Sequence, residues 1–326
     1  MLASMPVQPT VSVVLCTHNG ARYVEAQVAS ILRQVPAPAE LILGDDASTD
    51  GTVALVESLV AGSGVALVIR RHDPALGVRG NFADALARAT GDLIALSDQD
   101  DVWHDGKLAT LSAAFAADPE LLLVHTDARL VDGDGAPTGL TLLQALEATP
   151  DERAGLEHGD AFATLLRRNL VTGATVMIRR RLLDAAQPFA PDWVHDEWLA
   201  AIAAATGRLT LLPEALIDYR QHGGNQIGAA RPTMRQRWEK LREPREPRAS
   251  WLVARDEQLV AGLERAGAAP DRLEAARARL AHDRARRTLP AVNVARLPAI
   301  LRRGGQYARY SRGRIDQLRD LMQPLR

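Results

Sequence analysis

Carboxylates gather in three short clusters, each at the end of a predicted strand. The clusters are Asp45-Asp46, Asp98-Gln99-Asp100-Asp101 and Asp196-Glu197. Like charges packed together cost free energy unless a cation lies among them. Oxygen ligands suit Mg²⁺ or Mn²⁺, and Mg²⁺ typically binds one or two carboxylates together with water or phosphate oxygens. The middle cluster therefore predicts a divalent-cation site.

A purely local role is the alternative, because aspartates also begin turns and cap helices. In the segment DDASTDG, Ser48 or Asp50 is expected to cap the helix that begins near Thr52. Either cap leaves Asp46 spare at a strand end, where its carboxylate can accept a hydrogen bond from a ligand N–H. On spacing alone, a nucleobase role and a local role for Asp46 both stay open.

Short apolar runs alternate with helical patterns through the first 125 residues. Strands are predicted at 11–16, 40–44, 65–69, 93–96 and 121–125, and helices at 22–34, 52–59, 81–89 and 107–116. This alternation indicates βαβ units, and hence an α/β fold with a parallel sheet. Ligands of such sheets lie beyond the carboxyl ends of the strands. At that edge we expect the loops 17–20, 45–51, 72–80 and 98–105.

The rest of the chain is less regular. Gly133-Asp134-Gly135 predicts a hairpin turn, and residues 139–160 are interpreted as a mobile loop. Strands are predicted at 173–179 and 209–212, with a buried helix at 198–205. The segment EPREPR, around Pro244 and Pro247, predicts a linker because proline interrupts a helix.

Composition narrows the function classes. Apolar residues make up 47% of the 326, enough to bury a sizeable core, whereas 4% aromatic residues argue against an aromatic platform for single-stranded nucleic acid. The single cysteine, Cys16, excludes an intramolecular disulfide and fits a reducing compartment. With neither a signal-peptide pattern nor a run of about 18 apolar residues, we expect a cytoplasmic protein.

Charge divides the chain into an acidic body and a basic tail. Residues 1–230 carry 16 basic and 29 acidic residues, a net charge of −13, whereas residues 231–326 carry 23 and 11, a net charge of +12. We expect a catalytic domain over 1–230 and a basic helical extension over 231–326. The +12 segment lacks a recognisable nucleic-acid-binding module, so no nucleic-acid partner is expected.

The end of the tail has the pattern of a basic amphipathic helix. Its apolar positions are Tyr307, Tyr310, Ile315, Leu318, Leu321 and Met322, and its arginines are Arg309, Arg312, Arg314 and Arg319. Such a helix either lies on an anionic membrane surface or packs on the acidic body. Both alternatives stay open.

Seven segments in order resemble a known family. They are VSVVLCTHNGARYVEAQVASILRQ, ELILGDDASTDGT, LGVRGNF, ALSDQDDVW, NLVTGATVMI, VHDEWLA and DYRQHGGN. The set resembles the family-2 inverting glycosyltransferases of the GT-A fold and, more narrowly, their rhamnosyltransferase-like group. The resemblance implies a mostly parallel GT-A-like sheet flanked by helices, followed by a helical C-terminal extension.

The resemblance also implies an activity. A sugar, rhamnose in the narrower group, would move from a dTDP- or UDP-sugar to a hydroxyl of a glycan or lipid-linked acceptor in bacterial surface polysaccharide synthesis. Mg²⁺ or Mn²⁺ would be the cofactor, and the protein would lie in the cytoplasm or on the inner face of the plasma membrane. A catalytically inactive glycan-binding or scaffold subunit and a sugar nucleotidyltransferase stay open as alternatives.

Residue roles follow from the matched motifs. Donor binding is implied for Thr17, Asp46, Arg79 and Asp98, metal contact for Asp100 and His222, and the role of base for Asp196. Asp101 extends the acidic cluster, and His195 is interpreted as a structural or acceptor-side residue. Glu197 stands where the family usually has an aromatic residue, so it competes with Asp196 for the base role or alters the acceptor pocket. An inverting transfer needs a single carboxylate base.

Overall fold

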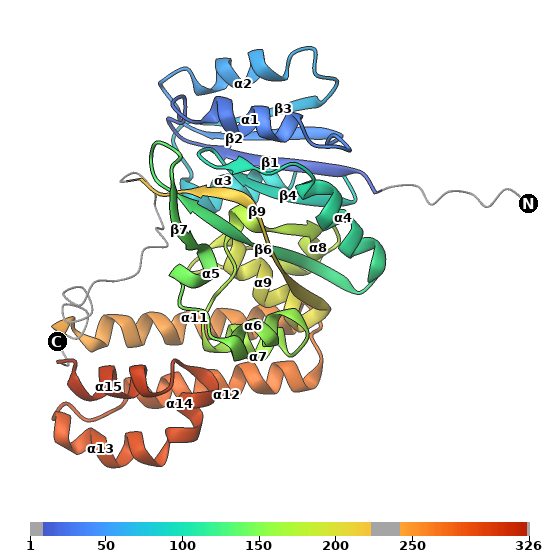
Figure 1. Cartoon of the computed structure of the whole chain (residues 1–326). Coiled ribbons are helices and arrows are strands. Elements are labelled where there is room, and N and C mark those ends of the chain that lie inside the picture. Colours follow the sequence, from blue (N-terminus) through green and yellow to red (C-terminus); the bar gives the residue numbers. More distant parts are fainter. Residues whose placement is uncertain (1–8, 223–241, 325–326) are drawn as a thin grey trace, which may run out of the picture.

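The computed structural model describes residues 9–222 and 242–324. A curved sheet forms its centre, with strands in the order β3-β2-β1-β4-β8-β6-β9-β5 and β7 paired to β6 (Figure 1). The strands are β1 Val11–Thr17, β2 Glu40–Asp46, β3 Ala66–His72, β4 Leu93–Asp98, β5 Val102–Trp103, β6 Leu121–Val131, β7 Pro137–Thr141, β8 Met177–Arg179 and β9 Arg208–Arg220. The predicted α/β fold is confirmed.

Helices flank both faces of the sheet (Figure 1). The N-terminal helices are α1 Val24–Leu32, α2 Thr52–Val60, α3 Gly77–Leu86 and α4 Lys107–Ala117. The middle of the chain forms α5 Leu142–Ala145, α6 Pro150–Glu157, α7 Ala161–Arg167, the 3₁₀ helix η1 Gly173–Thr175, α8 Leu182–Ala186 and α9 His195–Thr206. The last helices are α11 Arg245–Arg265, α12 Pro270–Arg287, α13 Asn293–Arg302, α14 Gly304–Tyr310 and α15 Arg314–Met322.

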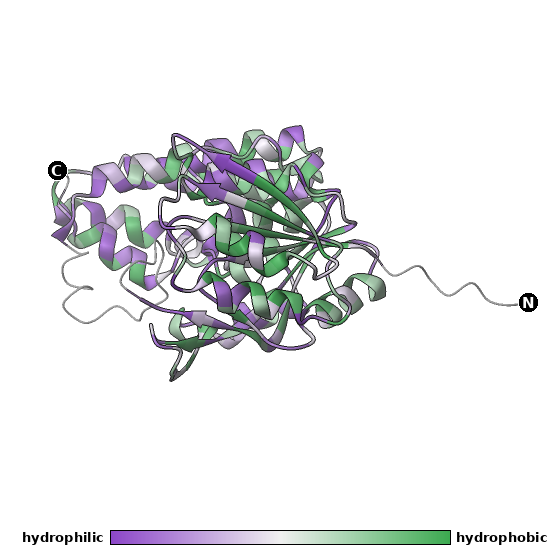
Figure 2. Cartoon of the chain, turned by 90° about the horizontal axis from the view of Figure 1, so that it is seen from above, coloured by the Kyte–Doolittle hydropathy of each residue, from purple (hydrophilic) through white to green (hydrophobic). Residues whose placement is uncertain are grey.

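Alternation along the strands divides the core between the two faces. Val13 and Leu15 of β1 pack with α1, α2 and α4, while Val14 and Cys16 pack with α3, α7 and α9. Figure 2 shows the central strands as largely hydrophobic, as strands covered on both sides must be. Strands β1, β2, β3 and β4 are parallel, so their carboxyl ends share one edge, while β8 runs antiparallel between β4 and β6.

Three local predictions need correction. Residues 139–160 are not a loop, because they include the end of β7, α5 and α6; Thr141 and Thr149 each begin a helix with a capping box. Helix α3 begins at Gly77, four residues before the predicted start at residue 81. The EPREPR segment is not an extended linker, since α11 begins at Arg245 and its first turn accommodates Pro247.

The C-terminal helices pack on the body and on one another. Helix α11 packs against α9 and α12, and α14 packs against α7. Tyr307 and Tyr310 are 1% and 8% exposed, so of the two alternatives left open for the tail, these two side chains follow the packing one. No helix in the described ranges is both long and apolar enough to cross a bilayer. The predicted domain boundary at 230/231 lies outside the described residues.

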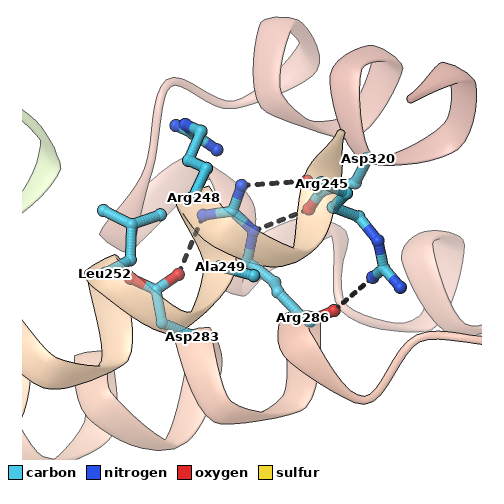
Figure 3. Close-up of a pocket in the computed structure, with 7 residues that line it drawn as sticks. All are labelled: Arg245, Arg248, Ala249, Leu252, Asp283, Arg286 and Asp320. Carbon is cyan, nitrogen blue, oxygen red and sulfur yellow. Dashed lines mark hydrogen bonds and ion pairs between the residues drawn. The ribbon is translucent and has the colours of Figure 1, made fainter. Parts of the chain in front are cut away.

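Buried arginines hold these helices together (Figure 3). The Arg286 guanidinium donates to Asp283 at 2.8 Å and to Asp320 at 2.6 Å, and the Tyr307 hydroxyl donates to Asp320 at 2.7 Å. Arg245 donates to the backbone carbonyl of Arg286 at 2.6 Å. The pocket among these side chains has a volume of about 10 Å³, room for one water molecule at most. Several arginines of the predicted basic tail are therefore buried inside the fold.

Candidate active site

Three loops at the carboxyl edge of the sheet are tied to one another. The His18 N–H donates to Gln99 Oε1 at 2.8 Å, and Gln99 Nε2 donates back to the His18 carbonyl at 3.2 Å. The Asn19 N–H donates to Ser48 Oγ at 2.8 Å. The loops that follow β1, β2 and β4 thus form one surface, at the edge where the topology predicts ligand binding.

Asp46 occupies the end of β2, but its carboxylate is not spare. Its oxygens accept hydrogen bonds from the backbone N–H groups of Leu76 at 2.6 Å and Gly77 at 2.9 Å, at the start of α3. Gly51, not Ser48 or Asp50, is the N-cap residue of α2, although Asp50 accepts the Thr52 N–H at the start of that helix. A carboxylate has about four lone-pair positions, so Asp46 keeps acceptor capacity for a ligand N–H.

Two of the other three residues implied in donor binding, Thr17 and Arg79, lie at the end of β1 and in α3. The Thr17 hydroxyl is buried and donates to Asp45 Oδ2 at 2.9 Å, so Thr17 orients a neighbouring carboxylate. Arg79 lies in the first turn of α3 with an exposed side chain. Within the part of the chain that the structure describes, its guanidinium makes no ion pair.

The loop after β4 is joined to the end of β9. Asp100 Oδ2 lies 2.8 Å from His222 Nε2, and the His222 ring stacks on Tyr23 with ring centroids 4.9 Å apart. The Arg220 N–H donates to Asp101 Oδ1 at 3.0 Å, and Arg220 Nε donates to the Asp100 carbonyl at 2.8 Å. The structure thus brings together the two residues for which the resemblance implies metal contact. Arg220 was missed because only β9 pairing places it there.

Crowding of carboxylates dominates the electrostatics of this site. Burial, reinforced by the charges of Asp100 and Asp196, raises the pKa of Asp98 to about 7. Burial, together with the charges of Asp100 and Asp98, raises the pKa of Asp101 well above its ordinary value. Asp98, Asp100 and Asp196 therefore interact through space, although Asp196 lies on a different element. Ionising all of them together is unfavourable without a compensating cation.

One buried cation, Lys107, lies close to this cluster. Its Nζ donates to the Ala174 carbonyl at 2.8 Å and lies 4.0 Å from the centroid of the Trp103 ring. Burial lowers the pKa of Lys107 to about 7, an effect that the charges of Asp101 and Asp98 oppose. Nothing in the sequence around Lys107, a lysine at the start of a helix, predicts that its side chain lies beside the carboxylates. Sequence reasoning therefore missed Lys107 as well.

The carboxylates fit a divalent cation of the Mg²⁺ or Mn²⁺ type. Asp98 and Asp100 supply the oxygen ligands that these ions prefer. Burial first, and then the neighbouring charge of Asp100, raises the pKa of Asp98, and a bound cation would oppose both effects. Among the described residues, no three histidine, cysteine, aspartate or glutamate side chains are arranged as a complete metal site. A site that uses one or two carboxylates with water and phosphate oxygens needs no such group.

Asp196 is held by backbone groups in the first turn of α9. Its Oδ2 accepts the Gly173 N–H and its Oδ1 accepts the Glu197 N–H, both at 2.7 Å. A Cβ added at Gly173 would lie 3.0 Å from His195 Nε2 and 3.4 Å from Asp196 Oδ2, so only glycine allows η1 to approach this closely. Burial raises the pKa of Asp196 to about 6 against these favourable hydrogen bonds.

The two residues that flank Asp196 in the sequence make their contacts with other parts of the protein. His195 is buried and stacks on Phe82 with centroids 3.8 Å apart, and burial lowers its pKa to about 3, so the ring is neutral. Glu197 forms a 2.6 Å ion pair with Arg255 of α11. The Arg255 guanidinium lies 4.1 Å from the Trp193 ring centroid. The C-terminal extension therefore reaches the first turn of α9, a contact that sequence reasoning missed.

Comparison with known proteins agrees with this arrangement. The model of the family described as "Glycosyl transferase family 2" matches residues 12–184. The chain belongs to glycosyl transferase family 2. An uncharacterized glycosyltransferase of Nostoc sp. is 28% identical over 235 residues, which cover 69% of each chain. A putative teichuronic acid biosynthesis glycosyltransferase of Bacillus subtilis is 30% identical over 53% of this chain and 63% of its own length.

Solved structures show the same fold as this family 2 glycosyltransferase. S. aureus TarS 1–349 in complex with UDP-GlcNAc is 16% identical, with a TM-score of 0.60 over 96% of this chain and 90% of that one. A mannosyltransferase from Pyrobaculum calidifontis, in complex with GDP-Man and Mn²⁺, is 20% identical, with a TM-score of 0.52 over 97% of this chain and 86% of that one. The GT-A-like architecture that the motifs imply is confirmed.

Replacing Asp98 with asparagine is expected to raise the melting temperature of the metal-free glycosyltransferase at pH 8. The folded protein favours the neutral form of Asp98, so its contribution to stability is present at acidic pH and is lost as pH rises from about 4 through about 7. Asparagine does not ionise. The melting temperatures of the two proteins, measured with a chelator present, should differ by a few degrees at pH 8 and converge near pH 4. A lower melting temperature for Asp98→Asn at both pH values would contradict the charge argument.

Proposed function

We propose that this family 2 protein is an inverting glycosyltransferase with Asp196 as its base. One observation carries the proposal. The backbone-held Asp196 carboxylate lies close enough to Asp98 to raise its pKa, and Asp98 shares the sheet edge with Asp100 and His222. This supports an arrangement in which Asp196, as proton acceptor, and the carboxylates of the sheet edge, as donor-binding groups, serve one site, as a displacement at a sugar carbon requires.

The chemistry assigned to Asp196 is the removal of one proton. An acceptor hydroxyl attacks the anomeric carbon in line, its proton passes to the Asp196 carboxylate, and the bond from that carbon to the diphosphate oxygen breaks. The nucleoside diphosphate leaves with the electron pair. With a pKa of about 6, Asp196 is mostly ionised at neutral pH and still basic enough to accept a proton. The two backbone N–H groups fix the direction in which the carboxylate points.

The Glu197 contact supports Asp196 over Glu197 as the base. Glu197 is paired at 2.6 Å with Arg255, so its carboxylate is already occupied by a cation of α11. Asp196 has no such ion pair in the described ranges, and its carboxylate is held by neutral donors alone. We assign Glu197 and Arg255 the role of holding the start of α9.

The donor is proposed to lie across the loops after β1, β2 and β4. Asp46 would accept a hydrogen bond from the nucleobase of the donor. Thr17, on the neighbouring strand, would hold Asp45 in place. The exposed guanidinium of Arg79 would contact the diphosphate. Asp98 and Asp100, with His222 against Asp100, would hold a divalent cation. When bound, that cation would neutralise the charge that develops on the leaving diphosphate.

The donor and acceptor classes rest on the motifs and the relatives together. The neighbours of known structure bind UDP-GlcNAc and GDP-Man, and the Bacillus subtilis relative bears a teichuronic acid biosynthesis name. We therefore propose a nucleoside-diphosphate sugar as donor and a growing bacterial surface glycan, free or lipid-linked, as acceptor. The rhamnosyltransferase-like motifs make dTDP-rhamnose the first donor to test, before UDP-sugars.

A screen of nucleotide sugars tests the proposal directly. The correct donor, supplied with Mg²⁺ or Mn²⁺ at about 100 times its dissociation constant, is expected to add about 2.7 kcal/mol to the free energy of unfolding. That donor should also release nucleoside diphosphate when an acceptor glycan is present. If a donor binds but no nucleoside diphosphate is released with any acceptor tested, the inactive glycan-binding subunit is favoured. Release of a nucleoside triphosphate from donor and pyrophosphate would favour the nucleotidyltransferase.

A further inference from the structure

The last helices of the chain present an unusual number of apolar side chains to solvent. Of the ten large hydrophobic residues that are exposed in the described part of the chain, seven lie between residues 292 and 322. These are Val292, Val294, Leu297, Leu301, Ile315, Leu318 and Met322. Single exposed hydrophobic residues are ordinary on protein surfaces, but a concentration of this kind is not.

These residues form a stripe on each of two adjacent helices. Val294, Leu297 and Leu301 follow the spacing i, i+3, i+7 on α13, and Ile315, Leu318 and Met322 follow the same spacing on α15. That spacing places side chains on one face of a helix. Helices α13 and α15 pack against each other. We call these six residues, with the arginines around them, the α13–α15 surface.

The inner faces of the same helices carry the charges. Arg296 of α13 is fully buried, and its guanidinium donates to the backbone carbonyls of Pro290 at 2.7 Å, Asp320 at 2.9 Å and Gln323 at 2.7 Å. Asp316 and Asp320 of α15 are 4% and 2% exposed. A helix that only packs on a protein body buries its apolar stripe. Here the described fold buries these charged side chains together with a small apolar cluster that includes Ile300, and it leaves the apolar stripes outward.

The exposed charge that helices α13 to α15 themselves contribute is positive, and the exposed carboxylate of Glu243 pairs with Arg319 of α15 at 3.1 Å. Among residues 287–324 the exposed ionisable side chains are all arginines, namely Arg287, Arg302, Arg309, Arg312 and Arg314. The two carboxylates in this range, Asp316 and Asp320, are both buried in ion pairs. Outward apolar side chains rimmed by arginine are the pattern that binds a membrane with an anionic surface.

We propose that the α13–α15 surface docks this protein on an anionic lipid bilayer. The leucines and valines enter the boundary between headgroups and acyl chains, and the arginines contact lipid phosphates. A second copy fits this surface less well, because a symmetric contact would place arginines against arginines. The surface differs from the one that the sequence predicted, since α13 contributes half of it and Tyr307 and Tyr310 are buried.

The position of the helices is compatible with catalysis on a membrane. Figure 1 shows α14 and α15 beside α12, with α13 beyond them, at the opposite end of the molecule from α2 and β3. Docking through them leaves the loops after β1 and β2 uncovered. The inference does not depend on the proposed function, because lipid binding is measured without donor or acceptor.

Co-sedimentation of the intact chain with vesicles tests the docking. We expect binding to vesicles of equal parts phosphatidylglycerol and phosphatidylcholine, and none to pure phosphatidylcholine. Leu301→Glu should weaken binding by about tenfold, because it places a carboxylate in the apolar stripe. Arg302→Gln should weaken it by about fivefold at low salt, with a smaller effect at high salt.

Val35→Glu is the matched control, because Val35 is 78% exposed and lies in the catalytic body, outside the α13–α15 surface. It should bind vesicles as the wild type does. Leu318→Glu repeats the test on α15, and melting temperatures show that each variant is folded. Wild-type failure to bind anionic vesicles, or equal losses for Val35→Glu and Leu301→Glu, would overturn the proposal. A lipid-free dimer in sedimentation velocity that Leu301→Glu converts to monomer would overturn it in favour of a protein interface.

Discussion

Asp196→Asn is expected to lower the turnover of sugar transfer by about 10²–10⁴-fold, the usual contribution of a general base, while donor affinity stays unchanged. The amide is nearly the same size as the carboxylate but cannot accept the proton of the acceptor hydroxyl. Steady-state kinetics with varied acceptor, combined with donor titration by calorimetry, measures the two effects separately. A loss of donor affinity in step with turnover would contradict the assignment of Asp196 as base.

The wild-type pH profile is part of the same expectation. Asp196 must be ionised to act, and its pKa is raised to about 6, so turnover should rise with pH through about 6 and level off above 7. Asp196→Asn should remove this rise. The variant also loses an acceptor for one of two backbone N–H groups, so its melting temperature is expected to fall modestly and must be measured beside its activity.

Glu197→Gln is the matched control for the base. Glu197 is the next residue on α9, and its carboxylate is paired with Arg255 at 2.6 Å. Losing this pair is expected to lower stability, with a much smaller loss of turnover than Asp196→Asn and no loss of the rise near pH 6. An active Asp196→Asn together with an inactive Glu197→Gln would move the base to Glu197.

Asp100→Ala is expected to abolish the metal-dependent part of donor binding and to leave the fold intact. Asp100 follows β4 with Asp98, and its carboxylate contacts His222 Nε2 at 2.8 Å. The variant should behave toward the donor as the wild type does in the presence of a chelator. Calorimetric titration of the nucleotide sugar with Mg²⁺, Mn²⁺ or chelator measures this, and circular dichroism reports whether the fold is preserved.

Asp105→Ala is a suitable control, because Asp105 lies in the same segment with its side chain 86% exposed and makes only a long 3.9 Å contact with Arg33. Its metal dependence should match that of the wild type. Donor binding by Asp100→Ala that still responds to Mg²⁺ or Mn²⁺ as the wild type does would show that the cation is held elsewhere. His222→Ala should then be tested as the next ligand.

The sequence alone sufficed for the features that are set by neighbours along the chain. Strand and helix alternation predicted β1 to β4 and their helices, because a buried parallel strand needs a continuous apolar run and each crossover needs a helix. The same alternation located the edge where Asp46, Asp98 and Asp100 emerge. The sequence also contains local signals for helix starts. The capping boxes at Thr141 and Thr149 are such signals, and they could have replaced the loop predicted over 139–160 with helices.

Tertiary structure alone decided which partners the polar groups have. Asp46 caps α3, Lys107 binds the Ala174 carbonyl and Arg255 reaches Glu197, and each partner is distant in sequence. The tertiary structure also decides the orientation of α13, because the burial of Arg296 turns the apolar stripe of this helix outward. The physical reason is that a buried polar group pairs with whichever group the packed chain places within about 3 Å of it. The spacing of residues along the sequence does not predict which group that is.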